Sequence, residues 1–257
     1  RPKARWALGG QPLAYSDSFP ERGFKDMSEQ NGTGKPRGKS RKWPITVAVV
    51  AVVAAVAGGG FWVWHEQPSF CHAICHTPMD PYLAAFEQEP GVRGVDKWGN
   101  TVENTDSMLA VVHAVPKEEG GADANCLSCH KPTMSQQLTE VSEWATGNMP
   151  LYANDTYGLV LGERDTEQLG EWLSQDGDAF CLNSACHNIT RQDLVKATAQ
   201  YGERNPHMAM HGQQLDCGDC HKAHRASVNA CSRCHDDAPI PDGWLTYDQA
   251  QEAANRA

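Results

Sequence analysis

The 257-residue chain has little positive charge and no sequence pattern for a nucleotide cofactor. It contains 22 Lys and Arg against 32 Asp and Glu, a formal net charge of −10. This shortage of basic residues argues against nucleic acid as a partner. We find no Gly-rich dinucleotide loop, flavin motif or molybdenum site in the sequence, so nothing points to an enzyme that uses one of those cofactors.

Long apolar runs are also scarce, and only one is long enough to cross a bilayer. It reads "ITVAVVAVVAAVAGGGFWVW", 20 uncharged residues from Ile45 to Trp64. Trp43, Trp62 and Trp64 lie at its ends, where membrane interfaces favour aromatic rings. A cleaved signal peptide has a shorter apolar region of about 7–15 residues. We therefore predict an uncleaved transmembrane anchor over residues 43–64.

Charge on either side of the anchor predicts its orientation. Residues 1–64 carry ten Lys and Arg and four Asp and Glu, which leaves 12 basic and 28 acidic residues beyond. By the positive-inside rule, residues 1–42 form a basic cytoplasmic tail, which its composition predicts to be disordered. Residues 65–257 then form an extracytoplasmic domain of a single-pass protein of the cytoplasmic membrane. Its acidity favours partners with basic patches.

The ten cysteines form five pairs, and a histidine follows the second cysteine of every pair. Three pairs read "CLSCH", "CGDCH" and "CSRCH", whereas "CHAICH" and "CLNSACH" are longer by one and two residues. C-x-x-C-H is the attachment motif of haem c, in which two thiols bind the porphyrin and the histidine binds the iron. We predict five covalently bound haem c groups, held by Cys71, Cys75, Cys126, Cys129, Cys181, Cys186, Cys217, Cys220, Cys231 and Cys234.

Two other interpretations of the cysteines stay open at this point. An even number of cysteines outside the cell is typical of a disulfide framework. The last two pairs, at 217–220 and 231–234, could also supply a four-thiolate zinc site. Neither interpretation requires a histidine after each pair, so we favour haem.

Five irons have ten axial positions, and the histidines nearly fill them. The post-cysteine ligands are His76, His130, His187, His221 and His235. We predict four more ligands for the later haems, His113, His207, His211 and His224. An iron with two histidine ligands has no substrate position, so such haems transfer electrons. His65 and His72 are left over, either as ligands or as ordinary surface histidines.

The first motif, "FCHAICHTPMD", leaves its iron ligand ambiguous. His76, Met79 and His72 all lie within it, and His65 lies just before it. We retain both His76 and Met79 as metal ligands.

The expected fold is mainly α with extensive loops: one N-terminal transmembrane helix and a multihaem cytochrome c domain packed around five haems. Helices are predicted to begin at Thr166 and at Thr190, the latter reaching Ala199, and a short surface helix to begin at Thr246. A helical apolar stripe is expected to pack on haem or core: Met134, Leu138, Val141 and Trp144.

Two segments resemble known families. "FCHAICHTPMDPY", seven residues beyond a single anchor, resembles the first-haem segment of membrane-anchored quinol dehydrogenase cytochromes of the NapC/NirT type. In some members the Met that corresponds to Met79 binds the first iron, and quinol lies near that haem. The stretch "NPHMAMHGQQLDCGDCHKAHRASVNACSRCH" is similar to the tetrahaem domain of flavocytochrome c fumarate reductases. That resemblance implies distal ligands at His207, His211 and His224.

These features predict an electron-transfer protein of anaerobic respiration. It would take electrons from membrane menaquinol and deliver them to an extracytoplasmic reductase. The flavocytochrome resemblance suggests a flavin-containing reductase of organic acceptors, whereas the NapC/NirT resemblance suggests a nitrate or nitrite reductase. Any quinol dehydrogenase activity would lie at haem 1, where Asp80 is the nearest proton acceptor. Asp96 and Lys97 are further candidates, and we expect both to be solvated surface charges.

Two alternatives differ in class. The chain could itself reduce a small substrate such as nitrite at an open haem, or it could be a structural cytochrome that polymerises into wires by sharing ligands. An open haem needs a five-coordinate iron, and polymerisation needs spare ligands such as His65 and His72.

Overall fold

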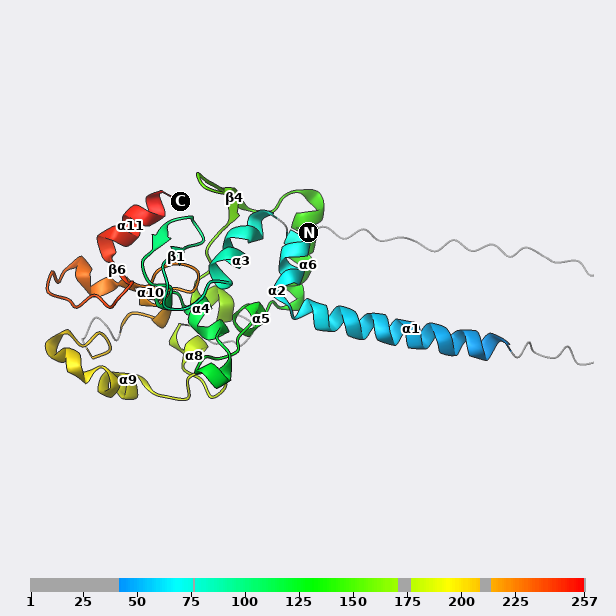
Figure 1. Cartoon of the computed structure of the whole chain (residues 1–257), viewed down its shortest axis with the longest axis horizontal. Coiled ribbons are helices and arrows are strands. Elements are labelled where there is room, and N and C mark those ends of the chain that lie inside the picture. Colours follow the sequence, from blue (N-terminus) through cyan, green and yellow to red (C-terminus); the bar gives the residue numbers. More distant parts are fainter. Residues whose placement is uncertain (1–41, 76, 171–176, 209–213, 257) are drawn as a thin grey trace, which may run out of the picture. The chain divides into compact units, whose positions relative to one another are not determined.

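The computed structural model describes residues 42–75, 77–170, 177–208 and 214–256 (Figure 1). The chain divides into two compact units, residues 1–49 and 50–257. The described residues are mainly helical with short strands, which confirms the expected fold class.

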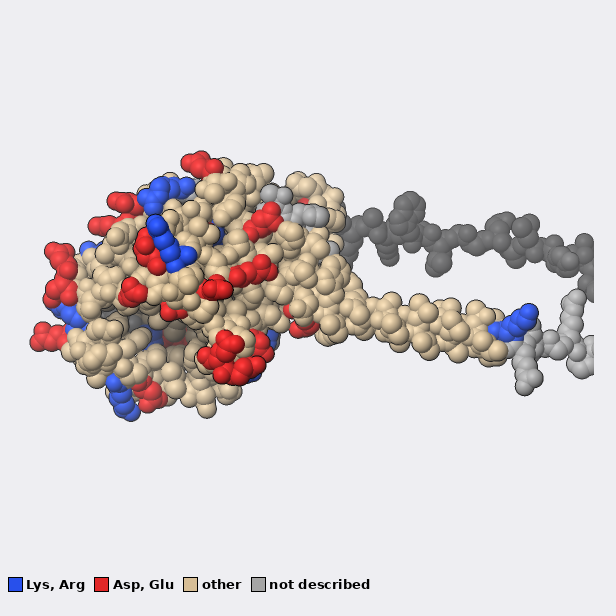
Figure 2. Space-filling view, viewed as in Figure 1, with Lys and Arg blue, Asp and Glu red and all other residues tan. Residues whose placement is uncertain are grey.

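Helix α1, Lys42–His65, contains the predicted anchor. Its 24 residues have a mean hydropathy of 2.2 in their most apolar window, and none is buried. Such a helix is about 36 Å long, enough for the hydrocarbon core of a bilayer. Figure 2 shows an uncharged surface along α1 with a basic side chain at one end, and Lys42 is the first residue of this helix. By length and composition alone, it is the only helix of the described residues that could cross a membrane.

The first cysteine motif follows α1 after a tight turn. The Gln67 amide donates to the Trp64 carbonyl at 2.9 Å, and helix α2, Pro68–Cys75, begins directly afterwards. A 3₁₀ turn, η1 (Thr77–Met79), leads into α3, Asp80–Phe86. Pro81 near the start of α3 suits a helix N-terminus, where an amide hydrogen has no helical partner.

Short helices joined by loops make up most of the remaining chain. They are η2 (Thr105–Ser107), α4 (Leu109–Ala114), η3 (Lys117–Glu119), α5 (Cys126–Cys129), α6 (Met134–Thr146), α7 (Thr166–Gly170), α8 (Asp178–Cys181), α9 (Arg191–Ala197), η5 (Ala199–Arg204), α10 (Cys217–Cys220), η7 (Ala230–Arg233) and α11 (Tyr247–Asn255).

The strands form three separate two-stranded sheets. Antiparallel pairs join β1 (Gly94–Val95) to β2 (Thr101–Val102), and β3 (Leu151–Asn154) to β4 (Gly158–Leu161). A parallel pair joins β5 (Val228–Asn229) to β6 (Leu245–Thr246).

The apolar core is small, which fits a domain expected to be organised around haem rather than around apolar side chains. Met108 and Val111 of the η2–α4 region are almost fully buried against Val102 and Ala226, with Leu245 beside them. Backbone bonds join the same regions: the Leu109 amide donates to the Lys222 carbonyl at 2.9 Å. The segment just before the second cysteine motif (126–130) is thus joined to the segment just after the fourth (217–221).

The predicted helix starts are largely confirmed. Thr190 with Asp193 and Thr246 with Gln249 both form reciprocal capping boxes. Helix α9 ends at Ala197 rather than Ala199, because the chain tightens into the 3₁₀ helix η5. Helix α7 begins at Thr166 as expected, but residues 171–176 lie outside the described residues.

Helix α6 corrects one of the two expectations for its apolar stripe. The stripe does not pack on a protein core, because Met134, Leu138, Val141 and Trp144 are at least half exposed, and packing on haem stays a prediction. The opposite, polar face is the less exposed one, and Glu140 forms an ion pair with Arg164 there. This polar attachment turns the apolar face outward.

Candidate haem attachment sites

Three of the five motifs place their first cysteine just after a polar cap that starts a single helical turn. Asn125 and Asp216 form capping boxes in front of α5 and α10. Asn229 accepts a hydrogen bond from the Cys231 amide at 3.0 Å. In a helical turn, residues three apart lie on one face. The caps therefore present both thiols of a regular C-x-x-C motif on the same side.

One backbone hydrogen bond recurs in every motif that the described residues include in full. The amide of the post-cysteine histidine donates to the carbonyl of the first cysteine. The four bonds are His130 to Cys126 (2.8 Å), His187 to Cys181 (3.2 Å), His221 to Cys217 (2.9 Å) and His235 to Cys231 (3.0 Å). The bond fixes each imidazole relative to its pair of thiols.

The longer motif "CLNSACH" keeps this bond because Asn183 folds its extra residues into a compact loop. The Asn183 amide side chain donates to the Phe180 carbonyl at 2.8 Å and accepts from the amides of Ala185 and Cys186 at 2.9 and 3.1 Å. The two additional residues are thus absorbed before Cys186. The stretched motif presents its histidine in the same register as a regular one.

Two pairs of imidazole rings have the separation expected of two axial ligands on one iron. The ring centroids lie 6.2 Å apart for His130 and His224, and 6.0 Å apart for His113 and His187. Two metal–nitrogen bonds of about 2.0 Å plus the two ring radii give roughly 6 Å between centroids. Each pair joins a post-cysteine histidine to one of the additional histidines predicted from the sequence.

Hydrogen bonding leaves one ring nitrogen free on the distal histidines. His113 Nδ1 lies 2.7 Å from the Leu109 carbonyl and His207 Nδ1 lies 3.1 Å from the Thr198 hydroxyl, which leaves Nε2 of each ring for a metal. His224 Nδ1 is buried and has no hydrogen-bond partner among the described residues. A polar atom in that state fits a group that the polypeptide alone does not supply.

The electrostatics favour neutral imidazoles, the form that binds iron. Burial lowers the pKa of His224 to about 3, and the proximity of His130 and Lys97 adds to the effect. Burial also lowers the pKa of His221 to about 4, with contributions from His207, His187 and His113. His207 is therefore close to His221, and its own pKa is lowered mainly by burial. His211 lies outside the described residues, so a pairing with His235 stays a prediction.

The first motif is only partly described, since His76 and the Cys75 side chain are not. Met79 ends η1 and is half-buried. His72 faces Asp80, with 2.8 Å between Nε2 and Oδ1, and both side chains are 49 % exposed. His65 packs on Phe61, Trp62 and Phe70. The position of His72 is that of a surface histidine, the second of the two roles considered from the sequence.

Thiols of successive motifs are neighbours in space. The Cys71 and Cys126 thiols lie close enough to shift each other's pKa, as do those of Cys181 and Cys217. Cys129 lies near Cys186, and Cys220 near Cys231. Each motif therefore has a thiol close to a thiol of the next motif in the sequence.

The disulfide and zinc interpretations receive no support from this arrangement. The nine cysteines of the described residues are free thiols. No group of three or more His, Cys, Asp or Glu side chains among the described residues is arranged to hold a metal ion directly.

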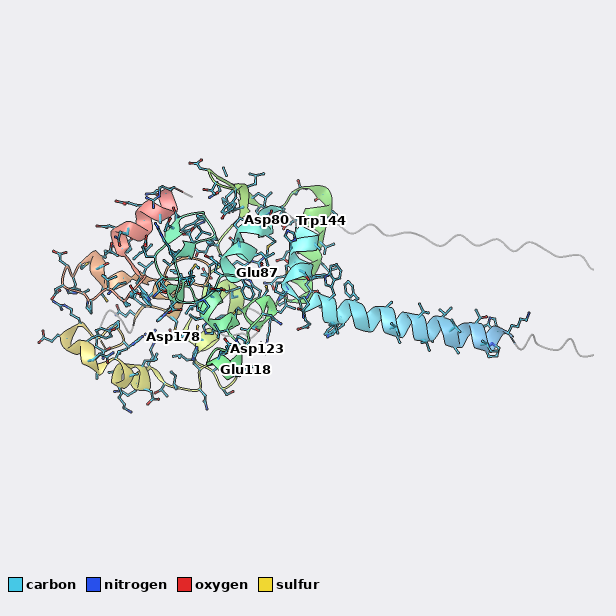
Figure 3. All side chains as sticks on the ribbon, in the orientation of Figure 1. Asp80, Glu87, Glu118, Asp123, Trp144 and Asp178 are labelled. Carbon is cyan, nitrogen blue, oxygen red and sulfur yellow. The ribbon has the colours of Figure 1, made fainter. Side chains whose placement is uncertain are left out.

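One expectation about charge was wrong. Asp96 and Lys97 are buried, with 3 % and 2 % of their surface exposed, and are not solvated surface charges. No local sequence pattern could indicate this burial, because Lys97 is paired with Glu163, which in turn binds Arg225, and both lie far along the chain. Asp80, in contrast, is exposed at the start of α3 (Figure 3).

Comparisons with known proteins agree with haem attachment. The cytochrome c3 family model matches residues 166–236. The chain is 54 % identical over 224 residues to cytochrome c-type protein Cgr1 of Eggerthella lenta, covering 87 % of this chain and 96 % of that protein. It is 39 % identical over 62 residues to the acrylate reductase cytochrome subunit of Shewanella woodyi, covering 23 % of this chain and half of the subunit. No solved structure matches. The chain therefore belongs to the c-type cytochromes, electron-transfer proteins that carry covalently bound haem c.

Proposed function

We propose that this cytochrome is a membrane-anchored, five-haem electron conduit. It takes electrons from menaquinol at the outer surface of the cytoplasmic membrane and delivers them to an extracytoplasmic reductase in anaerobic respiration. Haem c, when bound, supplies reversible one-electron chemistry at its iron. The single observation that carries the proposal is the succession of neighbouring attachment sites from Cys71 to Cys234, which begins six residues beyond α1.

The side of the chain next to α1 offers an acid–base pair for quinol oxidation, which releases protons. The Asp80 carboxylate and the His72 imidazole are in contact and open to solvent. A carboxylate held against an imidazole can accept a proton and pass it on through the ring. Asp80 is therefore retained as the proton acceptor, and His72 is added as its partner.

The reductase that receives the electrons is proposed to be a separate, flavin-containing protein. One relative is named as the cytochrome subunit of an acrylate reductase, so a related cytochrome works beside a reductase of a small organic acid. The acidic extracytoplasmic residues favour a partner with a basic docking face.

Reduction of purified full-length protein by a menaquinol analogue tests the proposal. We expect the haems to become reduced, and expect Asp80→Asn to slow this by about 10²-fold, the range for loss of a general base. Asp80→Glu should restore part of the rate, and Asp236→Asn, at an exposed carboxylate of the C-terminal part, should leave it unchanged. Chemical reduction by dithionite controls for haem content. A protein that stays oxidised with every quinol tried would contradict the dehydrogenase role.

The same preparation separates the two alternatives. A small-substrate reductase would show a high-spin haem that binds cyanide and turnover without a partner. A wire-forming cytochrome would polymerise, whereas the proposed conduit is a discrete species whose irons all have ligands from the same chain.

A further inference from the structure

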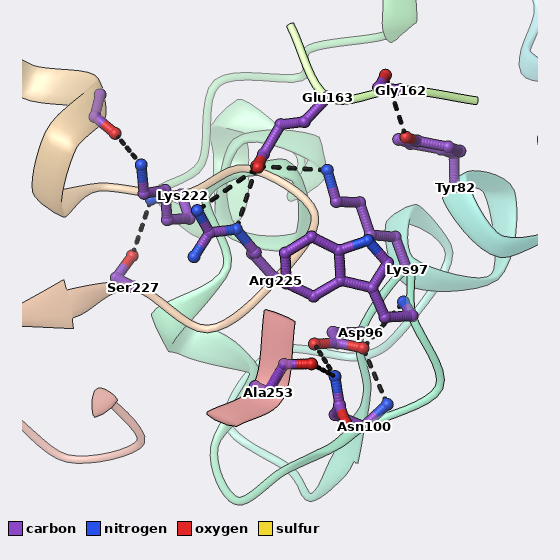
Figure 4. A network of polar contacts seen from close by, with 12 residues as sticks. Tyr82, Asp96, Lys97, Asn100, Gly162, Glu163, Lys222, Arg225, Ser227 and Ala253 are labelled. Atoms are coloured by element: carbon purple, nitrogen blue, oxygen red, sulfur yellow. Dashed lines mark hydrogen bonds and ion pairs between the residues drawn. The ribbon is translucent and has the colours of Figure 1, made fainter. Parts of the chain in front are cut away.

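Figure 4 shows a group of charged side chains that includes Lys97, Glu163 and Arg225. Lys97 joins this group to His224, because its backbone amide donates to the His224 carbonyl. Lys97 Nζ lies 3.2 Å from Glu163 Oε1, and Arg225 Nε lies 3.0 Å from the same oxygen. The Lys97 and Arg225 side chains are only 2 % and 14 % exposed, whereas that of Glu163 is 42 % exposed. The two cations are thus the shielded members of the group and the anion is the solvated one.

Lys97 is not needed to neutralise Glu163. The Arg225 guanidinium already binds both carboxylate oxygens, at 3.0 and 3.4 Å, in the two-pronged geometry that carboxylates prefer. The neighbouring Asp96 carboxylate accepts hydrogen bonds from the amides of Trp98 and Asn100 and also attracts Lys97. Beyond the Arg225–Glu163 pair, Lys97 is therefore an additional charge, and its side chain is the less exposed of the two cations, so solvent screens it least.

That additional charge is held close to His224. The Lys97 amide donates to the His224 carbonyl at 2.9 Å. The Tyr82 ring links the two side chains: its centroid lies 5.3 Å from Lys97 Nζ and 5.3 Å from the His224 ring. The Lys97 ammonium and the His224 imidazole therefore both lie against the same aromatic ring, and the backbone of the two residues is joined by a hydrogen bond.

We propose that Lys97 sets the reduction potential of the iron held between His130 and His224, by placing a buried positive charge beside His224. The inference rests on the proposed function, in which those two histidines share one haem. A positive charge in a medium of low polarity favours the reduced iron, which carries one positive charge less. Lys97 would act only through its electric field at the iron, because it contacts no substrate. Lys97 thereby makes the iron between His130 and His224, the second centre from the membrane in the proposed order, easier to reduce than it would be without this charge.

The test is a redox titration of the full-length protein in detergent, followed by low-temperature paramagnetic spectroscopy. The His130 and His224 rings are tilted by 31°, whereas the His113 and His187 rings are inclined by 74°. Low-spin haems with these two ring arrangements give different spectra, so the centre at His130/His224 can be distinguished from the one at His113/His187.

In Lys97→Gln we expect the redox equilibrium of that centre alone to shift about tenfold toward the oxidised form, which is 59 mV for one electron. Lys97→Arg should restore the potential, because it retains the charge. Lys196→Gln is the matched control, since it removes a lysine whose side chain is 70 % exposed and paired with an acid on its own helix. We expect no shift there.

Unchanged potentials in Lys97→Gln with full haem content would overturn the inference. If that variant loses haem, Glu163→Gln replaces it: removal of the anion should raise the potential of the same centre, and no rise would overturn the inference. Wild-type protein without a low-spin signal for this ring pair would instead remove the proposed function itself, before any variant is compared.

Discussion

The first attachment motif and the last three are built in different ways. In the stretch from Asp178 to His235, attachment turns are preceded by polar caps or folded by Asn183, and each histidine is bonded to its first cysteine. The first motif instead begins inside helix α2, which follows α1 after a two-residue turn, and its cysteines are four residues apart. The later motifs hold a fixed geometry, while the first lies at the junction with helix α1.

Under the proposed function, the two regions have different roles. Closely spaced rings, buried imidazoles and repeated backbone bonds suit centres that only transfer electrons. An exposed pair such as His72 and Asp80 suits the place where protons leave a substrate. The following predictions test this division, beginning with the largest expected effect.

Removal of one late attachment site should interrupt the conduit without unfolding the rest. We expect Cys217→Ala combined with Cys220→Ala to reduce the mass of the protein by one haem and to prevent electron delivery to an acceptor, while quinol still reduces the earlier centres. Mass spectrometry and stopped-flow absorbance measure the two effects. Full electron delivery without the fourth haem would show that the sequential order is wrong.

The small core should matter more than its size suggests. Met108 is completely buried, and it packs with Val102 and Val111, which precede the second motif, and with Ala226, which follows the fourth. We expect Met108→Ala to lower the free energy of unfolding by about 2–5 kcal/mol. Met134→Ala, on the 70 % exposed position of α6, is the matched control and should change it by less than about 0.5 kcal/mol. Denaturant titration of the holoprotein compares the two, and equal effects would contradict the assigned core.

The role of Asn183 can be separated from general loop stability. Asn183→Ala removes the hydrogen bonds that fold the longer motif, and we expect a cost of about 1–3 kcal/mol together with partial loss of the third haem. The neighbouring exposed Asn188→Ala should do neither. Unfolding curves and intact mass report both quantities, and full haem content in Asn183→Ala would mean that the loop forms without this side chain.

The smallest expected effect is the pH dependence of the Lys97 group. Burial would raise the pKa of Glu163, but Lys97 and Arg225 outweigh burial and lower it from 4.5 to about 2. A carboxyl with a lowered pKa stabilises the fold above its ordinary pKa, and this stability is lost as the pH falls from about 4.5 through about 2. We therefore expect Glu163→Gln to lose less stability than wild type over that interval. Unfolding experiments at pH 6 and pH 3 measure this. If wild type and Glu163→Gln lose the same free energy of unfolding between the two pH values, the ion pairs of Glu163 are contradicted.

Sequence patterns predicted the features that depend on local spacing. The cysteine–histidine motifs, the caps at Thr190 and Thr246, and the apolar run of α1 could all be identified because each pattern is complete within a few residues. The pairings of His130 with His224 and of His113 with His187 could not, since contacts between distant segments create them. For the same reason Lys97 was expected at the surface, although Glu163 and Arg225 cover it. The protein-core alternative for the α6 stripe was wrong because a polar contact, Glu140 with Arg164, lies on the opposite face, and the haem alternative stays a prediction.

The central claim is that each of the five thiol pairs carries a porphyrin, so that neighbouring centres connect the anchor helix to the far end of the domain. Intact-mass measurement of the mature protein tests it most directly. The account predicts the mass of the polypeptide plus five haems. A mass with four or fewer, with free thiols at "CHAICH" or "CLNSACH", would contradict it.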